Sequence, residues 1–212
     1  MPFKIYGFPP STCTRRVALV CKELNVPYEL IPVNIPKGEH KAPEYLKRQP
    51  FGVVPAIDDD GFTMFESRPV ARYLVAKYGK GSTLVPDPKD IIATAKFEQA
   101  VSVENNHFDE PAGELFLQLV IKPMRGLPKD EERVKALLAT LNSKLDVYEM
   151  VLAKQPYLGG DILTLADLFH LPWLYGLTEK AKLDLVTSRP NVARWYQEIS
   201  SRPAWQAVKD GA

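Results

Sequence analysis

Apolar positions along this chain follow two different patterns, one on each side of about residue 80. On the N-terminal side, short runs of strand-like alternation are interleaved with segments of helical spacing. These segments predict strands at 3–6, 28–33, 54–58 and 62–65 and helices at 12–24, 43–48 and 66–78. Asp59-Asp60-Gly61 separates the last two strands and is typical of a hairpin turn. The order predicts a small α/β domain that opens with a βαβ unit and continues with a hairpin and a helix.

A stretch rich in Gly, Ser and Pro, residues 79–89, interrupts both patterns and is typical of a linker. Beyond it, the apolar positions recur only at helical spacing. The predicted helices are 89–121, which we expect to bend, 129–152, one that begins at Thr164, 190–200 and 203–210. The expected fold is therefore α/β plus all-α, with an α/β domain at 1–78, a linker at 79–89 and an all-helical domain at 90–212.

Charge and cysteine content narrow the class of protein. The 212 residues include 27 Lys and Arg against 26 Asp and Glu, a formal charge of +1 without a basic block, which argues against nucleic acid as a partner. No apolar run reaches the roughly 18 residues of a membrane span, and the first residues do not form a targeting sequence. Cys13 and Cys21 lie about two turns apart on one predicted helix, roughly 12 Å, which is too far for a disulfide. We expect a cytoplasmic protein with no membrane partner.

The junction between the first strand and the first helix carries hydroxyl groups. Gly7–Pro10 ends the strand, and Ser11 or Thr12 can cap the helix that follows. The first turn of a helix presents unpaired N–H groups and the positive end of the helix dipole. A hydroxyl there can help to hold a thiolate, an oxyanion or a phosphate. Simple capping of the helix is the alternative interpretation.

Five short motifs follow one another along the N-terminal part of the chain. They are Ser11-Thr12 with Arg15-Arg16-Val17, Lys37-Gly38-Glu39-His40-Lys41, Gln49-Pro50-Phe51-Gly52, Val54-Pro55-Ala56 and Phe65-Glu66-Ser67-Arg68. The small α/β domain followed by an all-helical domain, with Ser11 at the first strand–helix junction, resembles the glutathione transferase family over the whole chain, and the order and spacing of the motifs resemble its phi class in particular. Each motif alone is an ordinary cap or turn. The resemblance implies a thioredoxin-like first domain that binds glutathione and a C-terminal helical bundle that carries the electrophile site.

The resemblance implies that the Ser11 hydroxyl donates a hydrogen bond to the glutathione sulfur and holds it as a thiolate. Lowering a thiol pKa of about 8.5 by two units requires about 2.7 kcal/mol. One charge-assisted hydrogen bond contributes about 1.5 to 3 kcal/mol and a helix N-terminus about 0.3 to 2 kcal/mol. These contributions are sufficient without a metal or a general base. The same thiolate would give a side activity toward organic hydroperoxides.

The resemblance also assigns residues that bind the glutathione peptide. Val54 and Pro55 match a cis peptide bond at which the backbone of Val54 pairs with the cysteinyl part of glutathione, whereas an ordinary trans proline is the alternative. Val53 stands where the family usually has Gln, so a side-chain contact to the peptide is expected to be missing.

Two further pairs complete the predicted glutathione site. Glu66 and Ser67 begin a helix and match positions that meet the γ-glutamyl ammonium and carboxylate, although capping alone would also explain them. His40 and Lys41 match positions that meet the glycyl carboxylate, and solvent-exposed loop residues are the alternative.

The resemblance places the electrophile site between the two domains, where Phe8, Leu115 and Phe116 would form an apolar wall, although core packing is the alternative for such residues. Phe51 resembles an aromatic residue that inserts into the neighbouring subunit of a homodimer, and packing within its own subunit is the alternative.

Cys13 raises the alternative of a thiol transferase, because some relatives use a cysteine near this junction for thiol-disulfide exchange. Alignment through Arg16 and Val17 places that cysteine at Ser11, so Cys13 lies two residues too far along. A carrier that binds apolar compounds without turnover and a helper domain of a larger assembly also remain open as functions. His40, His107 and His170 are scattered, so we predict no metal site.

Overall fold

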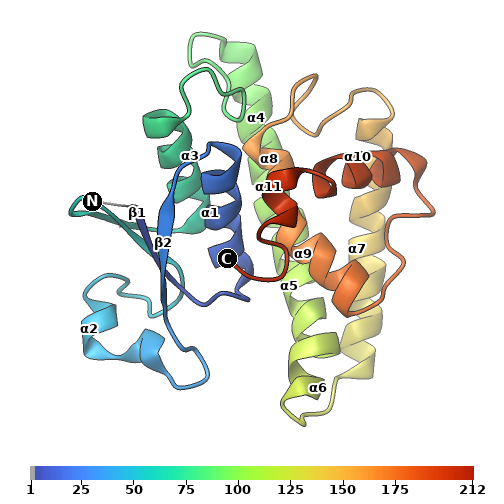
Figure 1. Cartoon of the computed structure of the whole chain (residues 1–212). Helices are drawn as coiled ribbons and strands as arrows, with labels where there is room; N and C mark the ends of the chain where they lie inside the picture. Colours follow the sequence, from blue (N-terminus) through green and yellow to red (C-terminus); the bar gives the residue numbers. More distant parts are fainter. Residues whose placement is uncertain (1–2) are drawn as a thin grey trace. The chain divides into compact units, whose positions relative to one another are not determined.

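The computed structural model describes residues 3–212 and divides into two compact units (Figure 1). The first unit contains the chain up to Ser82 together with Arg202–Ala212, and the second contains Thr83–Ser201. Met1 and Pro2, with which the predicted first domain begins, lie outside the described residues. Helical spacing predicts Arg202–Ala212 as part of the all-helical domain. It belongs instead to the first unit, because its short helix α11 (Pro203–Gln206) packs against the first helix of the chain.

A four-stranded sheet forms the centre of the first unit. Its strands are β1 (Phe3–Gly7), β2 (Tyr28–Pro32), β3 (Ala56–Asp59) and β4 (Phe62–Phe65), in the order β2-β1-β3-β4. β1 pairs in parallel with β2, and the pairings of β1 with β3 and of β3 with β4 are antiparallel. The predicted βαβ unit and hairpin are therefore confirmed. β3 begins two residues later than predicted because Pro55 has no N–H to donate to a neighbouring strand.

The helices of the first unit are α1 (Thr12–Glu23), the short η1 (Glu39–Lys41) and α2 (Pro43–Leu46), and α3 (Ser67–Tyr78). α1 and α3 pack against each other on one side of the sheet, and α2 lies on the other side (Figure 1). Ile5, Ile57 and Leu74 are almost fully buried between these layers. This arrangement holds the N-termini of α1 and α3 next to the ends of the central strands.

The hairpin between β3 and β4 has the turn that its sequence predicts. Asp59 pairs with Phe62, so that Asp60 and Gly61 form a two-residue loop. Their φ angles are 53° and 89°. Positive φ at both loop positions is the geometry of a type I′ turn, which matches the twist of the strands and favours Asp-Gly.

The second unit is helical. Its elements are α4 (Ile91–Val103), η2 (Glu104–Asp109), α5 (Glu110–Phe116), η3 (Leu117–Ile121), α6 (Lys122–Met124), α7 (Glu131–Leu152), α8 (Leu165–Leu168), α9 (Leu171–Tyr175), η4 (Gly176–Lys180) and α10 (Pro190–Ser200). η2 and η3 are π-helical and interrupt the long helix predicted at 89–121, which we expected to bend without a stated position. Pro111 follows η2 and lacks the N–H that an uninterrupted α-helical ladder requires there.

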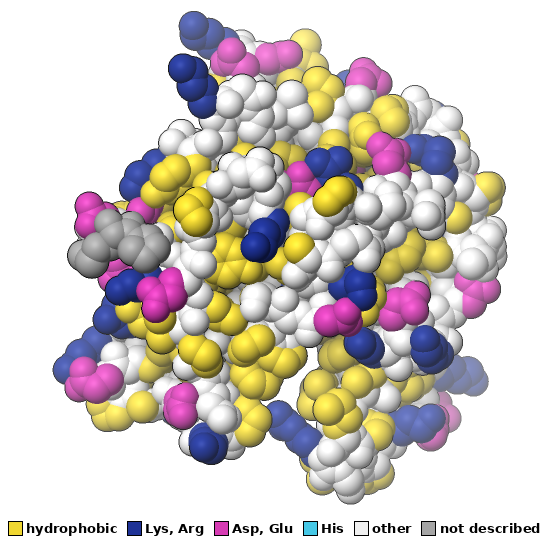
Figure 2. Space-filling model, viewed as in Figure 1, with side chains coloured by type: hydrophobic (Ala, Val, Ile, Leu, Met, Phe, Trp, Pro, Cys, Tyr) yellow, Lys and Arg dark blue, Asp and Glu magenta, His cyan; other side chains and the backbone are white. Residues whose placement is uncertain are grey.

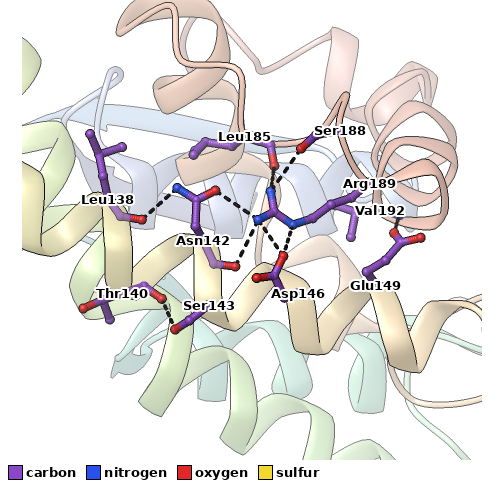
Figure 3. A network of polar contacts seen from close by, with 10 residues as sticks. All are labelled: Leu138, Thr140, Asn142, Ser143, Asp146, Glu149, Leu185, Ser188, Arg189 and Val192. Atoms are coloured by element: carbon purple, nitrogen blue, oxygen red, sulfur yellow. Dashed lines mark hydrogen bonds and ion pairs between the residues drawn. The ribbon is translucent and has the colours of Figure 1, made fainter.

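A capping box and one arginine hold the starts of α8 and α10 in place in the second unit. Thr164 and Asp167 form the predicted capping box at the start of α8. Arg189 precedes α10 and donates to Asp146 at 2.8 Å and to Asn142 Oδ1 at 3.0 Å, both on α7 (Figure 3). Glu149, one turn beyond Asp146, accepts hydrogen bonds from the first N–H groups of α10. These contacts hold α10 against α7.

Candidate active site

Ser11 stands at the N-terminus of α1, where the sequence places it. It is the N-cap residue, with φ −62° and ψ 133°, and its Oγ accepts a hydrogen bond from the Thr14 N–H at 3.4 Å. Its own N–H donates to the Phe8 carbonyl at 2.8 Å. A hydroxyl that accepts through a lone pair still has its O–H to donate. Capping the helix and donating to a ligand are therefore compatible roles for the same side chain.

The peptide bond between Val54 and Pro55, just before β3, is cis, as expected. Val54 is buried, and β3 begins only at Ala56, so Val54 lies outside the sheet pairing. Val53 is 48% exposed, and its carbonyl accepts from the Tyr45 hydroxyl at 2.7 Å. Its apolar side chain thus has no polar group to offer a ligand.

The start of α3 has an unusual backbone. Glu66 precedes the helix with φ 71° and ψ 108°, a region that side chains with a Cβ avoid. Such a conformation costs about 1 to 3 kcal/mol and persists where the surroundings impose it, often at functional sites. Ser67, the first residue of the helix, is buried and accepts a hydrogen bond from Arg16 at 2.9 Å.

Arg16 belongs to this region although the sequence pattern gives it no role in the site. It is fully buried on α1, and the same guanidinium nitrogen that donates to Ser67 lies 3.5 Å from the Cys13 sulfur. A positive charge is therefore held between the N-termini of α1 and α3. The sequence does contain a sign that Arg16 is buried, because this residue lies one helical turn before Val20 on the apolar face of the predicted helix.

His40 and Lys41 lie in η1, close to the loop of the Gln49-Pro50-Phe51-Gly52 motif. Lys41 donates to the Phe51 carbonyl at 3.1 Å. Gly52 has a φ of 62°, and a Cβ there would lie 2.7 Å from the Lys41 side chain, so the position requires glycine. The Nδ1 atom of His40 is buried without a hydrogen-bond partner within the described part of the chain. A polar ligand atom at this loop would satisfy it.

The predicted residues of the electrophile site belong to different units. Phe8 packs with Val33 and Val54 in the first unit and lines a hollow of about 270 Å³ there, together with Pro9, Pro32, Val33, Asn34 and Glu39. In the second unit, Phe116 packs its ring on Trp173 with 5.6 Å between centroids. Leu115 is fully buried, which corrects its prediction as a wall residue, since it has no surface to offer a ligand.

The two cysteines have different environments, and neither forms a disulfide in the structure. Cys13 is half-buried beside Arg16. Cys21 is fully buried, and desolvation raises the pKa of its thiol to about 12, so it stays protonated at neutral pH. Only Cys13 has the exposure that a reactive thiol requires.

Phe51 is 70% exposed at the tip of its loop and meets Phe65 edge to face, with 6.0 Å between ring centroids. Most of the ring is therefore accessible on the surface of this unit.

The molecular surface carries charges of both signs. On the face drawn in Figure 2, Lys and Arg side chains lie among Asp and Glu side chains and do not form one basic area. Among residues 3–212, no helix is long and apolar enough to cross a membrane. The same residues contain no group of three or more His, Cys, Asp or Glu side chains that could hold a metal ion.

Comparisons with known proteins identify the family. Residues 5–83 match the model of the glutathione S-transferase N-terminal domain, and residues 108–203 match that of the C-terminal domain. The chain is 50% identical to glutathione S-transferase PM239X14 of Arabidopsis thaliana over 196 residues, which cover 91% of this chain and 89% of the relative.

Two solved structures extend the similarity to the fold. Glutathione transferase F7 from Populus trichocarpa has a TM-score of 0.91 and 36% identity, with 97% of each chain covered. Glutathione S-transferase I from maize, in complex with an atrazine glutathione conjugate, has a TM-score of 0.90 and 34% identity, with 99% of this chain and 97% of the other covered. These similarities confirm the predicted fold class, a thioredoxin-like domain followed by a helical domain. This chain belongs to the glutathione S-transferase family and resembles its phi class.

Proposed function

We propose that this enzyme joins glutathione to apolar electrophiles, with Ser11 as the residue that holds the glutathione sulfur as a thiolate. The observation that carries the proposal is the position of the Ser11 hydroxyl at the N-cap of α1. Its oxygen accepts from the helix, and its proton is left to donate to a sulfur that approaches the first turn. The helix dipole favours negative charge at that place.

The transfer step follows from this arrangement. The thiol proton leaves to water when glutathione binds, and the thiolate attacks the electrophilic carbon of a compound such as an aryl halide. A carbon–sulfur bond forms, and the halide leaves with its electron pair. Attack of the same thiolate on a peroxide oxygen would give the side activity toward organic hydroperoxides. The O–O bond breaks, the alcohol leaves after taking up a proton, and the glutathione sulfenic acid that remains reacts with a second glutathione to give the disulfide and water.

Glutathione would lie across the first unit, with each of its charged ends near groups that can form ion pairs or hydrogen bonds with it. The backbone of Val54, next to the cis bond, would pair with the cysteinyl part. The start of α3 at Glu66 and Ser67 would receive the γ-glutamyl end, and the strained backbone of Glu66 supports a functional role there. His40 and Lys41 would receive the glycyl carboxylate, which the buried unpartnered Nδ1 of His40 supports.

Two further expectations belong to the same proposal. The exposed ring of Phe51 supports a homodimer in which this side chain enters the neighbouring subunit. The two free cysteines suit a reducing compartment such as the cytoplasm. Small apolar electrophiles, rather than nucleic acid or a membrane, are the expected partners.

The test is removal of the Ser11 hydroxyl. We expect Ser11→Ala to lower the rate of conjugation of a model aryl halide at least tenfold, about 1.4 kcal/mol of transition-state stabilisation or more, while binding to immobilised glutathione stays nearly unchanged. Thr12→Ala, which removes the neighbouring hydroxyl on the first residue of α1, is the matched control and should keep most of the activity. Equal turnover in Ser11→Ala and the unmodified enzyme would remove Ser11 from this role.

A further inference from the structure

The segment Arg202–Ala212, which we call the terminal segment, packs beside the loop that carries Ser11. It belongs to the first unit, and Figure 1 draws it in red next to α1. Arg15 on α1 and Lys209 in this segment are in contact although they lie 194 positions apart in the sequence. The contacts of the terminal segment therefore join residues far apart in the sequence beside the candidate active site.

Two arginines fasten the terminal segment to α1. Arg202 donates from Nε and Nη2 to the two carboxylate oxygens of Glu23, at 2.6 Å each, and the Glu23 side chain is only 7% exposed. Arg15 donates to the Lys209 carbonyl at 2.6 Å, and its guanidinium lies 5.7 Å from the centre of the fully buried Trp205 ring. A bidentate ion pair and a stacked arginine fix direction as well as distance, so the segment has a defined place on the helix.

The end of the terminal segment reaches the Ser11 loop itself. The Ala212 N–H donates to the Pro9 carbonyl at 3.1 Å, and the Gly211 N–H donates back to Val208 at 3.2 Å. Pro9 and Pro10 have no N–H groups, so the loop between Phe8 and Ser11 offers few donors to its own carbonyls. The Pro9 carbonyl accepts instead from Ala212, which lies far from it in the sequence.

The terminal segment acts together with other contacts that hold this loop. The start of the loop is held at Gly7, whose carbonyl accepts from the Val33 N–H at 2.9 Å. A Cβ at Gly7 would lie 2.5 Å from the Thr14 side chain, so the two residues pack closely. The exit is held by Ser11, which caps α1. Ala212 supports the middle. A displacement of about 1 Å in a group that positions a reactant can cost on the order of a hundredfold in rate, so the middle support matters for the Ser11 hydroxyl.

We propose that the terminal segment is a brace that sets the position of the Ser11 hydroxyl, with Ala212 and Arg15 as positioning residues for glutathione transfer. The inference rests on the proposed role of Ser11. Ala212 contributes this support through its backbone N–H. Loss of the hydrogen bond from that N–H should change the ionisation of the bound glutathione thiol rather than the stability of the fold.

The test compares Ala212→Pro, which lacks the N–H, with Ala212→Gly, which keeps it. The measurements are kcat and KM with an aryl halide, and the pKa of the enzyme-bound glutathione thiol from the ultraviolet absorbance of the thiolate. We expect Ala212→Pro to raise that pKa by about half a unit or more, which is at least a threefold loss of thiolate below the pKa, and to lower kcat roughly three- to tenfold. KM for glutathione should stay within about twofold, and Ala212→Gly should match the unmodified enzyme.

Arg15→Met gives a second and independent variant. It keeps the length of the side chain and removes the donor to the Lys209 carbonyl, and it should reproduce the changes in thiol pKa and kcat. Its thermal unfolding is recorded in parallel, and if this variant does not fold, the Ala212 pair decides the question alone.

The outcomes separate this inference from the proposed function. An unchanged thiol pKa and kcat in Ala212→Pro, or equal losses in Ala212→Pro and Ala212→Gly, would overturn the brace, while a loss of activity in Ser11→Ala would leave the role of Ser11 in place. Full activity of Ser11→Ala would overturn the role of Ser11 and the brace with it, whatever the Ala212 variants show.

Discussion

At the scale of single residues, the site depends on a few side chains that serve structure and chemistry together. Ser11 caps α1 through its oxygen, and its O–H remains able to donate a hydrogen bond, as the proposed role in binding the glutathione sulfur requires. Arg16 is fully buried between Cys13 and Ser67 and brings a positive charge to the place where two helices begin. Buried guanidinium groups need partners to offset desolvation, so Arg16 also fixes the distance between α1 and α3.

Cys13 offers a test at this scale. We expect Cys13→Ser to keep conjugation of an aryl halide within about twofold, because the cysteine is one residue inside α1 and its sulfur lies beside Arg16. The measurement compares conjugation with reduction of a glutathione mixed disulfide in the same preparation. Loss of the disulfide reaction alone would instead identify Cys13 as the reactive residue of a thiol transferase. Cys21, whose pKa burial raises to about 12, should stay unmodified by thiol reagents in both proteins.

At the scale of elements, one buried carboxylate joins the hairpin to α3. Asp59 at the end of β3 is 4% exposed and accepts hydrogen bonds from Tyr73 at 2.7 Å, Lys77 at 2.6 Å and Tyr78 at 2.7 Å. Burial raises the pKa of this carboxyl, but the hydrogen bonds from Lys77 and the two tyrosines outweigh burial and hold it below its usual value. The carboxylate therefore stabilises the packing of α3 on the sheet in its charged form.

The lowered pKa predicts how stability depends on pH. A carboxyl whose pKa is lower in the folded protein stabilises the fold above its unfolded pKa of about 3.9 and loses that contribution as the pH falls below it. We expect Asp59→Asn to lower the free energy of unfolding at neutral pH by about 2 to 3 kcal/mol. The difference from the unmodified protein should shrink below about pH 4. Chemical denaturation at several pH values measures this.

Asp60→Asn is the matched control, since it makes the same substitution one residue further along. Asp60 is exposed and has a φ of 53°, a conformation that asparagine adopts readily. The free energy of unfolding should therefore change little in Asp60→Asn. A loss in Asp59→Asn that stays constant down to about pH 3 would show that the charge of Asp59 is not the cause.

At the scale of the whole molecule, the proposed homodimer depends on an apolar side chain that lies outside the core of its own subunit. Phe51 lies on a loop that Lys41 and Gly52 hold in place, and its ring is exposed except for the contact with Phe65. A rigid loop that presents an aromatic ring is suited to an isologous interface, in which each copy inserts the same residue into the other.

We expect Phe51→Ala to weaken the homodimer by about 2 kcal/mol or more, a rise in Kd of roughly thirtyfold, because an inserted aromatic side chain is a typical hot spot. Sedimentation velocity over a range of concentrations measures the dimer. Phe62→Ala removes another half-exposed phenylalanine of the same unit, one that packs on Tyr73, and serves as the control. A monomer at all concentrations in the unmodified protein, or equal effects of the two variants, would contradict the role of Phe51.

Features that depend on neighbouring residues could be predicted from the amino-acid sequence alone. Apolar spacing predicts the order of strands and helices, Asp60-Gly61 predicts a hairpin, and the hydroxyls of Ser11 and Thr12 predict where α1 begins. These features follow from backbone geometry and hydrogen bonds within a few residues, so a local pattern is sufficient to predict them.

The tertiary structure decided what depends on residues far apart in the sequence. It buried Leu115, brought Arg16 to Ser67 across 51 positions, and placed the terminal segment with the first unit. The position of Arg16 on the apolar face of its helix indicates burial, but no local pattern identifies Ser67 as its partner or places the terminal segment in the first unit. The physical reason is that packing and long-range hydrogen bonds select among arrangements that local propensity leaves equal in energy.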